Sequence, residues 1–416
     1  MEFLENLHGI AVCASVQTGR VSRYLAPDHA GRGFFLYNKL MASTTFRAAC
    51  ATGENWEIVA DRCLSELCSE PLVANLGFLY VTDALARHLD PLLQRLREKT
   101  GVHGWEGTVG AGICCTGREI YDEPGAAVML ASLPDDAYRL LPSGIEPLSD
   151  MLAANSNWLA EKDAHFGIVH GDSRNSYLPQ IIESLSSQLD PGFLVGGLTS
   201  SSDEHFQQQI AGEITEGGLS GVLLSGEVPV ISSLTQGCTP LGSKHVITEC
   251  SGNVLAGLDG QPALDIFKKD IGEVLSHDLS RVAGYIFAGF PIPGSDTGDY
   301  LVRNLIGIDP EEKLLAVADN LENDVQIMFC RRDGDAARED MLRMLADLGK
   351  RAQGQIRGGV YYSCLGRGRY QFGENSEELK LISEQLGDFP LVGFFANGEI
   401  SHNRLYGYTG VLTLFV

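Results

Sequence analysis

The sequence lacks the basic clusters that nucleic-acid-binding proteins use to neutralise phosphates. It has 31 Lys and Arg against 54 Asp and Glu, which gives a net charge of −23. Its basic clusters, Arg331-Arg332 and Arg367 with Arg369, are short. Because binding to a phosphate backbone requires several clustered Lys and Arg, the charge balance argues against a nucleic-acid partner. A short basic cluster still suits one small anion.

Long apolar runs are also missing. No run approaches the roughly 20 residues that a helix needs to cross a bilayer. The first residues, MEFLENLHGIAVCASVQTGR, place acidic residues before a short apolar run, which is the wrong polarity for a secretory signal. Hydrophobic residues make up 44% of the chain, as in globular proteins. We therefore expect a cytoplasmic protein without membrane insertion.

The ten cysteines form no Cys-x-x-Cys pair, and most lie inside apolar segments. The sequence therefore offers neither a zinc-ligand spacing nor a disulfide framework. Free thiols in a reducing compartment, mostly buried, are the interpretation that this pattern favours. No metal ligands are predicted.

The common catalytic motifs are absent as well. The chain contains no P-loop, no Gly-x-Ser-x-Gly, no His-Glu-x-x-His and no complete Gly-x-Gly-x-x-Gly. Cys364 stands at a strand end beside glycines, but a cysteine nucleophile needs a base. His402 is the nearest histidine in the neighbouring loops. We predict no catalytic residues. A hydrolase-like enzyme that uses Cys364 or carboxylates remains an alternative.

Strand-like and helix-like segments alternate after Met41, which predicts a mixed α/β fold. The length of 416 residues favours two halves, about 44–235 and 243–416. Residues 1–43 show no sustained period. They are interpreted as a loosely ordered arm. The alternative is that residues 1–40 are translated from upstream of the true start at Met41.

Three regions share one order of elements. Each has an apolar strand, a helix, a strand with Val-Gly, a turn with Glu-Ile and a closing strand. The turns are TGREI (116–120), AGEI (211–214) and NGEI (397–400). We therefore predict internally repeated strand–helix–strand–turn–strand units that form mixed sheets with packed helices. A feature present three times favours a structural role for Glu119 and Glu213.

The last unit carries a candidate binding site. One strand ends at Cys364 and leads into the glycine-rich LGRGRYQFG, and a second buried strand leads into Asn397-Gly398-Glu399. If these strands are parallel neighbours, both loops emerge at the same sheet edge. Arg367 and Glu399 then approach each other and can orient a zwitterion, guanidinium to carboxylate and Glu to ammonium. A salt bridge that only ties the two loops is the alternative.

Two further segments follow strand-like runs in the same half. Arg332-Asp333 comes after VQIMFC and before a helix, so Asp333 is either a ligand-site residue or an ordinary helix cap. Arg303 follows DYLV. Ser376 is placed to cap the helix that begins at Glu377.

The segments YYSCLGRGRYQFG (361–373) and PLVGFFANGEISHNRLYGYTGVLTL (390–414) resemble the FIST family. DYLVRNLIGIDP (299–310), VQIMFCRRDGDAAREDM (325–341), WEGTVGAGICCTGREI (105–120) and FLVGGLTSS (193–201) are similar to other parts of it. The resemblance covers roughly 44–416. It implies a FIST N-terminal region (44–235) and a FIST C-terminal region (243–416).

What the resemblance implies is a stand-alone sensory protein of intracellular signal transduction. It would bind a small polar or amino-acid-like ligand and signal to a downstream protein. One branch of the family binds haem and senses nitric oxide, so haem is the alternative cofactor. His170 and His402 are then the least implausible ligands among ten scattered histidines. The predicted ligand-binding residues are Arg303, Arg332, Asp333, Cys364, Arg367, Gly368, Asn397 and Glu399.

Overall fold

The computed structural model describes residues 24–27, 33–36, 44–143, 148–189, 192–272, 279, 282, 284–292 and 300–416. The chain divides into two compact units, residues 1–43 and 44–416. In the first unit, β1 (Tyr24–Pro27) and β2 (Gly33–Leu36) form an antiparallel pair. The rest of the predicted N-terminal arm, Met41 included, lies outside the described residues.

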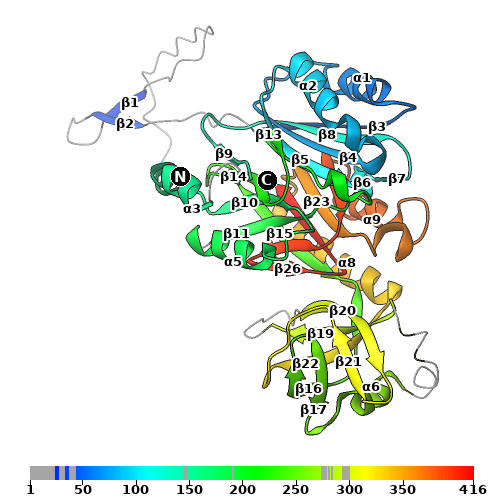
Figure 1. Cartoon of the computed structure of the whole chain (residues 1–416). Coiled ribbons are helices and arrows are strands. Elements are labelled where there is room, and N and C mark those ends of the chain that lie inside the picture. The colour runs from blue at the N-terminus through cyan, green and yellow to red at the C-terminus, as the bar shows by residue number, and fades with distance from the viewer. Residues whose placement is uncertain are drawn as a thin grey trace, which may run out of the picture. The chain divides into compact units, whose positions relative to one another are not determined.

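The second unit is a mixed α/β structure, as predicted, with 28% helix and 42% strand. It contains three six-stranded mixed sheets and a barrel of strands (Figure 1). The first sheet has the order β13 (Glu213–Thr215), β12 (Gln209–Ala211), β5 (Gly104–Gly110), β4 (Leu76–Thr82), β8 (Gly125–Ser132) and β3 (Thr45–Thr52).

The other two six-stranded sheets have related topologies. The second has the order β26 (Arg404–Tyr406), β25 (Glu399–His402), β11 (Phe193–Leu198), β10 (Phe166–Gly171), β14 (Leu219–Leu224) and β9 (Tyr138–Leu141). The third has the order β15 (Val230–Gln236), β27 (Thr409–Phe415), β23 (Gly358–Cys364), β24 (Leu391–Ala396), β6 (Gly112–Cys115) and β7 (Arg118–Tyr121).

Each six-stranded sheet is centred on the same three-strand pattern. A parallel pair, β4 with β5, β10 with β11 or β23 with β24, is joined by an antiparallel return strand, β8, β14 or β27. The hairpin after each parallel pair joins a different sheet. β6–β7 follows β5 and pairs with β24 of the third sheet. β12–β13 follows β11 and pairs with β5 of the first sheet, and β25–β26 follows β24 and pairs with β11 of the second sheet. The three sheets are therefore linked in a cycle.

The predicted Glu-Ile turns do not occupy equivalent places in this pattern. Glu119 lies in the second strand of its hairpin, β7, and Glu213 begins the second strand of its hairpin, β13. Glu399 instead begins the first strand of its hairpin, β25. The third carboxylate consequently lies close to the end of the parallel pair, where the candidate site is.

A glycine in each parallel pair marks equivalent positions in the three sheets. A Cβ atom on Gly107, Gly196 or Gly393 would lie 1.8 Å from the carbonyl oxygen of the neighbouring strand. These carbonyl oxygens belong to Leu79, Val169 and Tyr361. The next residues in the sequence are Tyr80, His170 and Tyr362, and all three are fully buried. Their rings lie 5.3–6.1 Å apart. Equivalent side chains of three sheets thus meet at one point.

These three residues form a buried polar hub with Glu106, which is also fully buried. Nε2 of His170 lies 2.5 Å from Oε1 of Glu106. The Tyr80 hydroxyl donates to Oε2 of Glu106 over 3.2 Å and lies 2.8 Å from the Tyr362 hydroxyl. Buried polar groups need such partners because desolvation is otherwise uncompensated. The hub therefore links polar side chains of all three sheets, while Nδ1 of His170 makes no hydrogen bond among the described residues.

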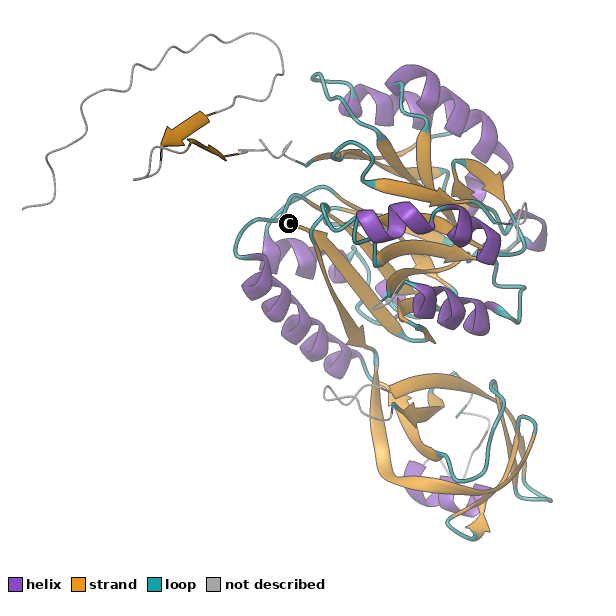
Figure 2. Ribbon diagram, turned by 90° about the vertical axis from the view of Figure 1, so that its left-hand side faces the viewer, coloured by secondary structure: helices purple, strands orange, loops and turns teal. Residues whose placement is uncertain are grey.

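Apolar side chains from all three sheets surround the hub and form the central core. Helices cover the outer faces of the sheets, each with its own apolar cluster (Figure 2). They are α1 (Trp56–Leu67) and α2 (Leu89–Thr100) on the first sheet, α5 (Leu178–Gln188) on the second, and α8 (Gly334–Ala352) and α9 (Glu377–Leu386) on the third. The short helices are α3 (Leu148–Ala154), α4 (Ser156–Glu161), η1 (Asp83–His88), η2 (Glu204–Phe206) and η4 (Gly368–Tyr370).

Local sequence explains where several helices begin and end. The side chain of Asn55 accepts from the amide of Ile58 over 2.9 Å and caps α1. Gly101, with φ of 73°, ends α2 in the left-handed conformation that glycine tolerates best. Asp333 caps α8 by accepting from the amide of Ala336 over 3.1 Å. Ser376 makes no side-chain cap for α9, contrary to the prediction, because its hydroxyl accepts from the amide of Glu119 instead.

The barrel lies in the sequence between β15 and α8. Its strands follow the order β16 (Cys238–Ser251), β22 (Gln326–Arg332), β19 (Ile286–Pro291), β20 (Tyr300–Asp309), β21 (Leu314–Val317), β17 (Val254–Leu258) and β18 (Gln261–Pro262). An additional pairing of β16 with β17 closes the ring, and α6 (Ala263–Ile271) packs against it. The predicted boundary between residues 235 and 243 remains a prediction.

Candidate functional site

The parallel pairing of β23 with β24 brings the two predicted loops together. Cys364 and Ala396 are register partners at the ends of these strands. The loop after Cys364 and the turn at Asn397-Gly398 therefore leave the sheet at one edge, as the sequence predicted. The amide of Leu365 donates to the carbonyl of Ala396 over 3.0 Å and ties the two loops together.

The Glu378 carboxylate organises the first of these loops. It accepts from Nε of Arg367 over 2.8 Å, from the amide of Gly368 over 2.7 Å and from the Tyr361 hydroxyl over 2.7 Å. The hydroxyl of Ser363 adds a further bond. The side chains of Arg367 and Glu378 are both fully enclosed. The ion-pair partner of Arg367 is therefore Glu378 rather than Glu399.

Only one of the three guanidinium nitrogen atoms of Arg367, Nε, has a hydrogen-bond partner among the described residues. Neither Nη1 nor Nη2 makes a hydrogen bond among the described residues, and the guanidinium lies 4.9 Å from the ring centroid of Phe372. Burial lowers the pKa of Arg367, but the Glu378 carboxylate and Tyr361 outweigh it and raise the pKa above its ordinary value. The site thus holds a permanent buried cation with two open nitrogen atoms.

Glu399 is the second buried charged group. Its Oε2 accepts from the amide of Thr409 over 3.1 Å and from the hydroxyl of Thr409 over 2.8 Å. Its Oε1 makes no hydrogen bond among the described residues. Burial raises the pKa of Glu399 to about 8, although Thr409, Arg367 and Cys364 act in the opposite direction. At neutral pH this carboxyl group is mostly protonated.

A pocket of about 400 Å³ lies at the sheet edge next to these groups. Its walls come from the barrel, from the loops after β23 and β24, and from the segment that joins β26 to β27. Volumes of this order suit small molecules. The lining residues are Pro179, Val302, Arg303, Asn304, Ala318, Asp319, Cys364, Leu365, Gly366, Ala396, Asn397, Gly398, Leu405, Tyr406, Gly407 and Tyr408.

Three of the predicted residues line this pocket. Arg303 donates to Asp319 over 2.8 Å and to the carbonyl of Leu405 over 3.3 Å. Asn397 is exposed, and its amide donates to the carbonyl of Leu198 over 3.0 Å. Cys364 is half-buried. The structure therefore brings together residues that are up to 94 positions apart in the sequence (303 to 397).

The remaining predicted residues do not line the pocket. Arg367, Gly368 and Glu399 are buried beside it. Arg332 donates to the carbonyl of Gly366 and so supports the loop from behind. Asp333 is the helix cap that the sequence offered as the alternative role.

Cys364 has the properties of a neutral thiol. Burial and the nearby Glu399 raise its pKa above the ordinary range, while the amide of Gly366 donates to the sulfur over 3.4 Å. His402, the base that sequence reasoning considered, is exposed, and its ring lies 5.4 Å from that of Phe193. The described lining of the pocket contains no histidine. A thiolate requires a lowered pKa or a base.

Sequence reasoning missed Tyr408, Asn304, Asp319 and the central role of Glu378. Tyr408 is half-buried, has φ of 60°, and donates from its hydroxyl to Oδ1 of Asn304 over 3.0 Å. Its ring lies 4.3 Å from that of Phe287 in the barrel. A Cβ atom on Gly366 would lie 3.0 Å from the Tyr408 ring. Tyr408 therefore connects the barrel to the loop of the site.

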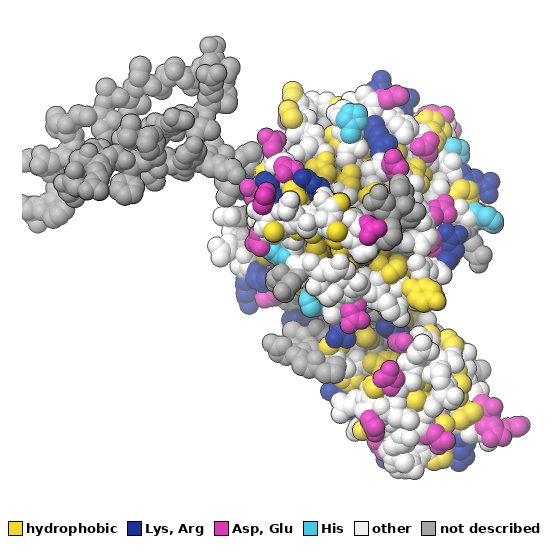
Figure 3. Space-filling view, turned by 60° about the vertical axis from the view of Figure 1, so that its left-hand side comes forward, with side chains coloured by type: hydrophobic (Ala, Val, Ile, Leu, Met, Phe, Trp, Pro, Cys, Tyr) yellow, Lys and Arg dark blue, Asp and Glu magenta, His cyan; other side chains and the backbone are white. Residues whose placement is uncertain are grey.

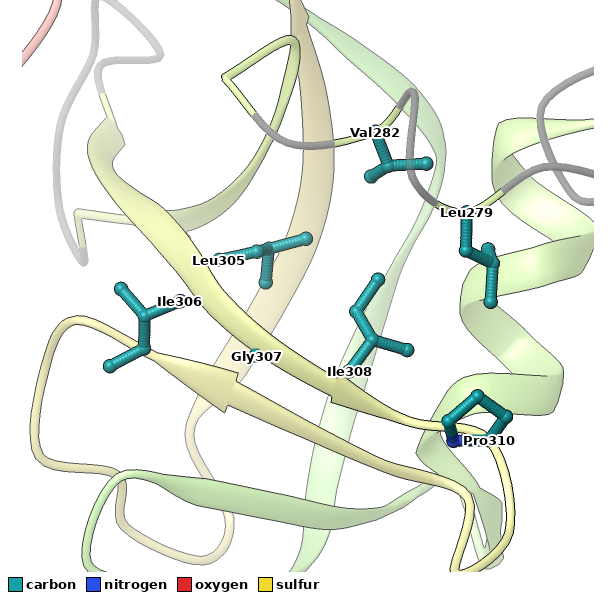
Figure 4. A pocket seen from close by; sticks show the side chains of 7 residues that line it. All are labelled: Leu279, Val282, Leu305, Ile306, Gly307, Ile308 and Pro310. Atoms are coloured by element: carbon teal, nitrogen blue, oxygen red, sulfur yellow. The ribbon is translucent and has the colours of Figure 1, made fainter.

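A second pocket of about 330 Å³ lies on the barrel (Figure 4). Its described lining is apolar and consists of Leu279, Val282, Leu305, Ile306, Gly307, Ile308 and Pro310. Binding sites usually combine apolar walls with a few polar groups that fix orientation. This pocket offers no polar side chain among its described residues.

The two histidines considered for haem do not suit an axial ligand at the candidate site. His170 is fully buried, and its Nε2 contacts Glu106. His402 does not line the described pocket. In the described residues no group of three His, Cys, Asp or Glu side chains is arranged to hold a metal. The nine cysteines of these residues are free.

The distribution of surface charge and the length of the apolar helices both bear on the kind of partner. On the face shown in Figure 3, Lys and Arg side chains lie among acidic and uncharged ones. Within the described part of the chain, no helix is both long enough and apolar enough to span a bilayer.

Two family models match this chain. A model described as the FIST N domain matches residues 75–261, and one described as the FIST C domain matches residues 263–402. The chain belongs to the FIST family. The resemblance predicted from the sequence is thus confirmed. FIST domains are associated with sensory roles in signal transduction.

Similar relatives occur in mycobacteria. An uncharacterised protein of Mycobacterium tuberculosis (strain H37Rv) is 30% identical over 330 residues, which cover 74% of this FIST chain and 83% of the relative. An uncharacterised protein of Mycobacterium bovis is 28% identical over 383 residues, which cover 86% of this chain and 94% of the relative. The similarity therefore extends over both FIST regions.

The raised pKa of Glu399 predicts how the stability of this FIST protein depends on pH. A carboxyl group with a folded pKa near 8 keeps a proton that the unfolded chain loses near 4.5. Its contribution is fully present below about pH 4.5 and is lost as the pH rises through about 8. We expect Glu399→Gln to remove a slope of up to about 1.4 kcal/mol per pH unit.

Urea unfolding between pH 5 and 8.5 measures this slope. Glu213→Gln is the matched control, because Glu213 occupies an exposed Gly-Glu-Ile turn. Glu119, whose burial raises its pKa to about 7, keeps a residual slope of the same sign in every variant. Parallel profiles for wild type and Glu399→Gln would show that Glu399 is not the titrating group.

Proposed function

We propose that this FIST protein is a sensory module that binds a small polar ligand of the amino-acid type in the pocket at the barrel edge. The observation that carries the proposal is the placement of unsatisfied charge. Oε1 of Glu399 and both Nη atoms of Arg367 are buried and have no hydrogen-bond partner among the described residues, and these two residues directly follow Gly398 and Gly366 of the pocket lining. Buried groups of this kind are costly unless water or a ligand satisfies them.

The polar groups around the pocket suit a zwitterion. Arg303 offers a guanidinium group for a ligand carboxylate, which would replace the carbonyl of Leu405 as its acceptor. Asp319 supplies negative charge for a ligand ammonium group, and the buried Glu399 adds to it when its carboxyl group, with a pKa of about 8, is ionised. The neutral thiol of Cys364, with its raised pKa, favours a role in packing against the ligand rather than in attacking it.

The position of the pocket also suggests a sensory output. One wall belongs to the barrel, at Arg303 and Asp319, and the other to the sheet edge, at Cys364 and Asn397. A ligand that contacts both walls favours the arrangement in which they are close, and it can shift a conformational population only through such differential contacts. A downstream signalling protein would recognise that arrangement.

The test is a thermal-shift screen of the purified protein against the twenty amino acids. A ligand at 100 times its Kd adds about 2.7 kcal/mol to the free energy of unfolding. We expect at least one amino acid to stabilise the wild type and Arg303→Ala to weaken its binding at least tenfold. Arg95→Ala is the matched control, because Arg95 forms a surface ion pair with Asp61 on α1 and α2.

Two outcomes would contradict the proposal. One is the absence of stabilisation by every amino acid and short peptide. The other is equal ligand affinity in wild type, Arg303→Ala and Arg95→Ala, which would place binding elsewhere. Because an ammonium ligand requires ionised Glu399, binding should also tighten as the pH rises from about 6 to about 7.5, and it should weaken at higher pH, where the α-amino group of the ligand loses its proton (pKa about 7.7–8.0).

A further inference from the structure

A second cavity lies beside the pocket. The neighbouring cavity has a volume of about 210 Å³ and shares Pro179, Arg303 and Leu405 with the first. Its other lining residues are Gln180, Glu183, Leu301, Asn403 and Arg404. Arg303 and Leu405, which line both cavities, are joined by the hydrogen bond from Arg303 to the carbonyl of Leu405. We refer to the two neighbouring cavities together as the groove.

An edge strand runs along this groove. Among the described residues, β26 is the terminal strand of its sheet and pairs with β25 on its inner side. Arg404 and Leu405 line the second cavity, and Leu405 to Tyr408 line the first. At about 3.3 Å per residue, the segment 404–408 spans roughly 13 Å. An extended chain of two or three residues has a similar length.

The backbone of β26 presents hydrogen-bonding groups to the groove. The carbonyl of Leu405 accepts from Arg303 of the barrel, so it points away from β25. In an extended strand the N–H and C=O groups of one residue lie on the same side. Leu405 therefore offers a donor and an acceptor to a chain that adds to this edge, as peptides do in β-augmentation.

Charged side chains lie in or next to both cavities of the groove. Glu183 and Arg404 line the second cavity, Arg303 lines both cavities, and Asp319 lines the first. Glu399 is fully buried and directly follows Gly398 of the first cavity's lining. A peptide with its ammonium group toward Glu399 would place its later residues and carboxylate near Arg404.

We propose that the ligand of this site is a short extended peptide of two or three residues that lies along β26. This inference rests on the proposed function and names the class of its ligand. The polar peptide backbone would bond to Leu405, and the open volume at Glu183 and Arg404 would accept the second or third residue. Release of Arg303 from Leu405 would accompany binding.

The experiment compares the twenty amino acids with tripeptide mixtures grouped by central residue, using calorimetry on the full chain. We expect the best tripeptides to bind at least tenfold more tightly than any amino acid, a difference of about 1.4 kcal/mol. Arg404→Ala should weaken peptide binding at least fivefold and leave amino-acid binding unchanged. The matched control is Arg118→Ala, because exposed Arg118 likewise begins an edge strand, β7.

The outcomes separate the two proposals. If amino acids bind as tightly as tripeptides and Arg404→Ala changes neither, the peptide inference is overturned while the proposed function stands. If neither class binds, both are overturned. N-acetylated tripeptides that bind as well as free ones would also contradict the inference, because they lack the ammonium group placed toward Glu399.

Discussion

Glu378→Ala is expected to destabilise the protein by about 3–5 kcal/mol, which is the cost of leaving one charge of a buried pair without its partner. The Glu378 carboxylate is fully enclosed and accepts from Arg367, Gly368, Tyr361 and Ser363. Its removal leaves the Arg367 guanidinium buried without a counter-ion. The loop of the site then loses both its charge balance and its anchor to α9.

Chemical denaturation measures this effect, and the neighbouring residue supplies the control. Glu377 begins the same helix, is half-buried and pairs with Lys380 over 3.2 Å. A surface pair of this kind contributes little, so Glu377→Ala should cost less than about 1 kcal/mol. If the two variants lose similar stability, Glu378 does not organise the loop as we describe.

The second large effect is expected at the hub where the three sheets meet. Glu106→Ala removes the carboxylate that contacts His170 and accepts from Tyr80, and it leaves a cavity in a fully buried region. We expect a loss of about 3–5 kcal/mol in the free energy of unfolding. Because the hub joins all three sheets, unfolding should remain a single transition at lower denaturant.

Tyr362→Phe is the graded comparison at the hub. It removes only the hydroxyl that lies 2.8 Å from the Tyr80 hydroxyl, so it should cost about 1 kcal/mol. Equal losses in Glu106→Ala and Tyr362→Phe would mean that the carboxylate is not the organising group. Two separate transitions in Glu106→Ala would contradict the view that the hub joins the sheets into one cooperative unit.

The sequence predicted those features that depend on local patterns. The cap of α8 at Asp333 is one of the two roles that residue type and spacing offered for this residue. The strands that end at Cys364 and Ala396 are parallel neighbours, which is the condition under which the sequence placed their loops at one sheet edge. That pairing was enough to predict which two loops meet at the site.

Features that depend on distant pairing were not predictable. Closure of the barrel pairs β16 with β17 and β22, and the exchanged hairpin places β25 beside β11. Strand partners are chosen by packing rather than by intrinsic propensity. The interpretation of Ser376 as a cap was wrong because a distant amide, that of Glu119, uses its hydroxyl.

The pairing of Arg367 illustrates the same limit within the site. Sequence order suggested Glu399 as its partner, because both residues follow strand ends. The carboxylate of Glu378, which lies 11 residues after Arg367 in the sequence, reaches it from the first turn of α9. Glu399 instead retains an open oxygen atom, and this is what makes it a candidate for ligand binding.

Hydrogen–deuterium exchange tests the central claim most directly. The probe is the amino acid or tripeptide that gives the largest thermal shift, added at saturation to the full chain. Binding in the pocket predicts slower exchange at both walls, in the barrel at 302–304 and 318–319 and in the sheet edge at 364–366, 396–398 and 405–408. Protection confined to the apolar barrel pocket at 305–308, or absent from one wall, would contradict the account.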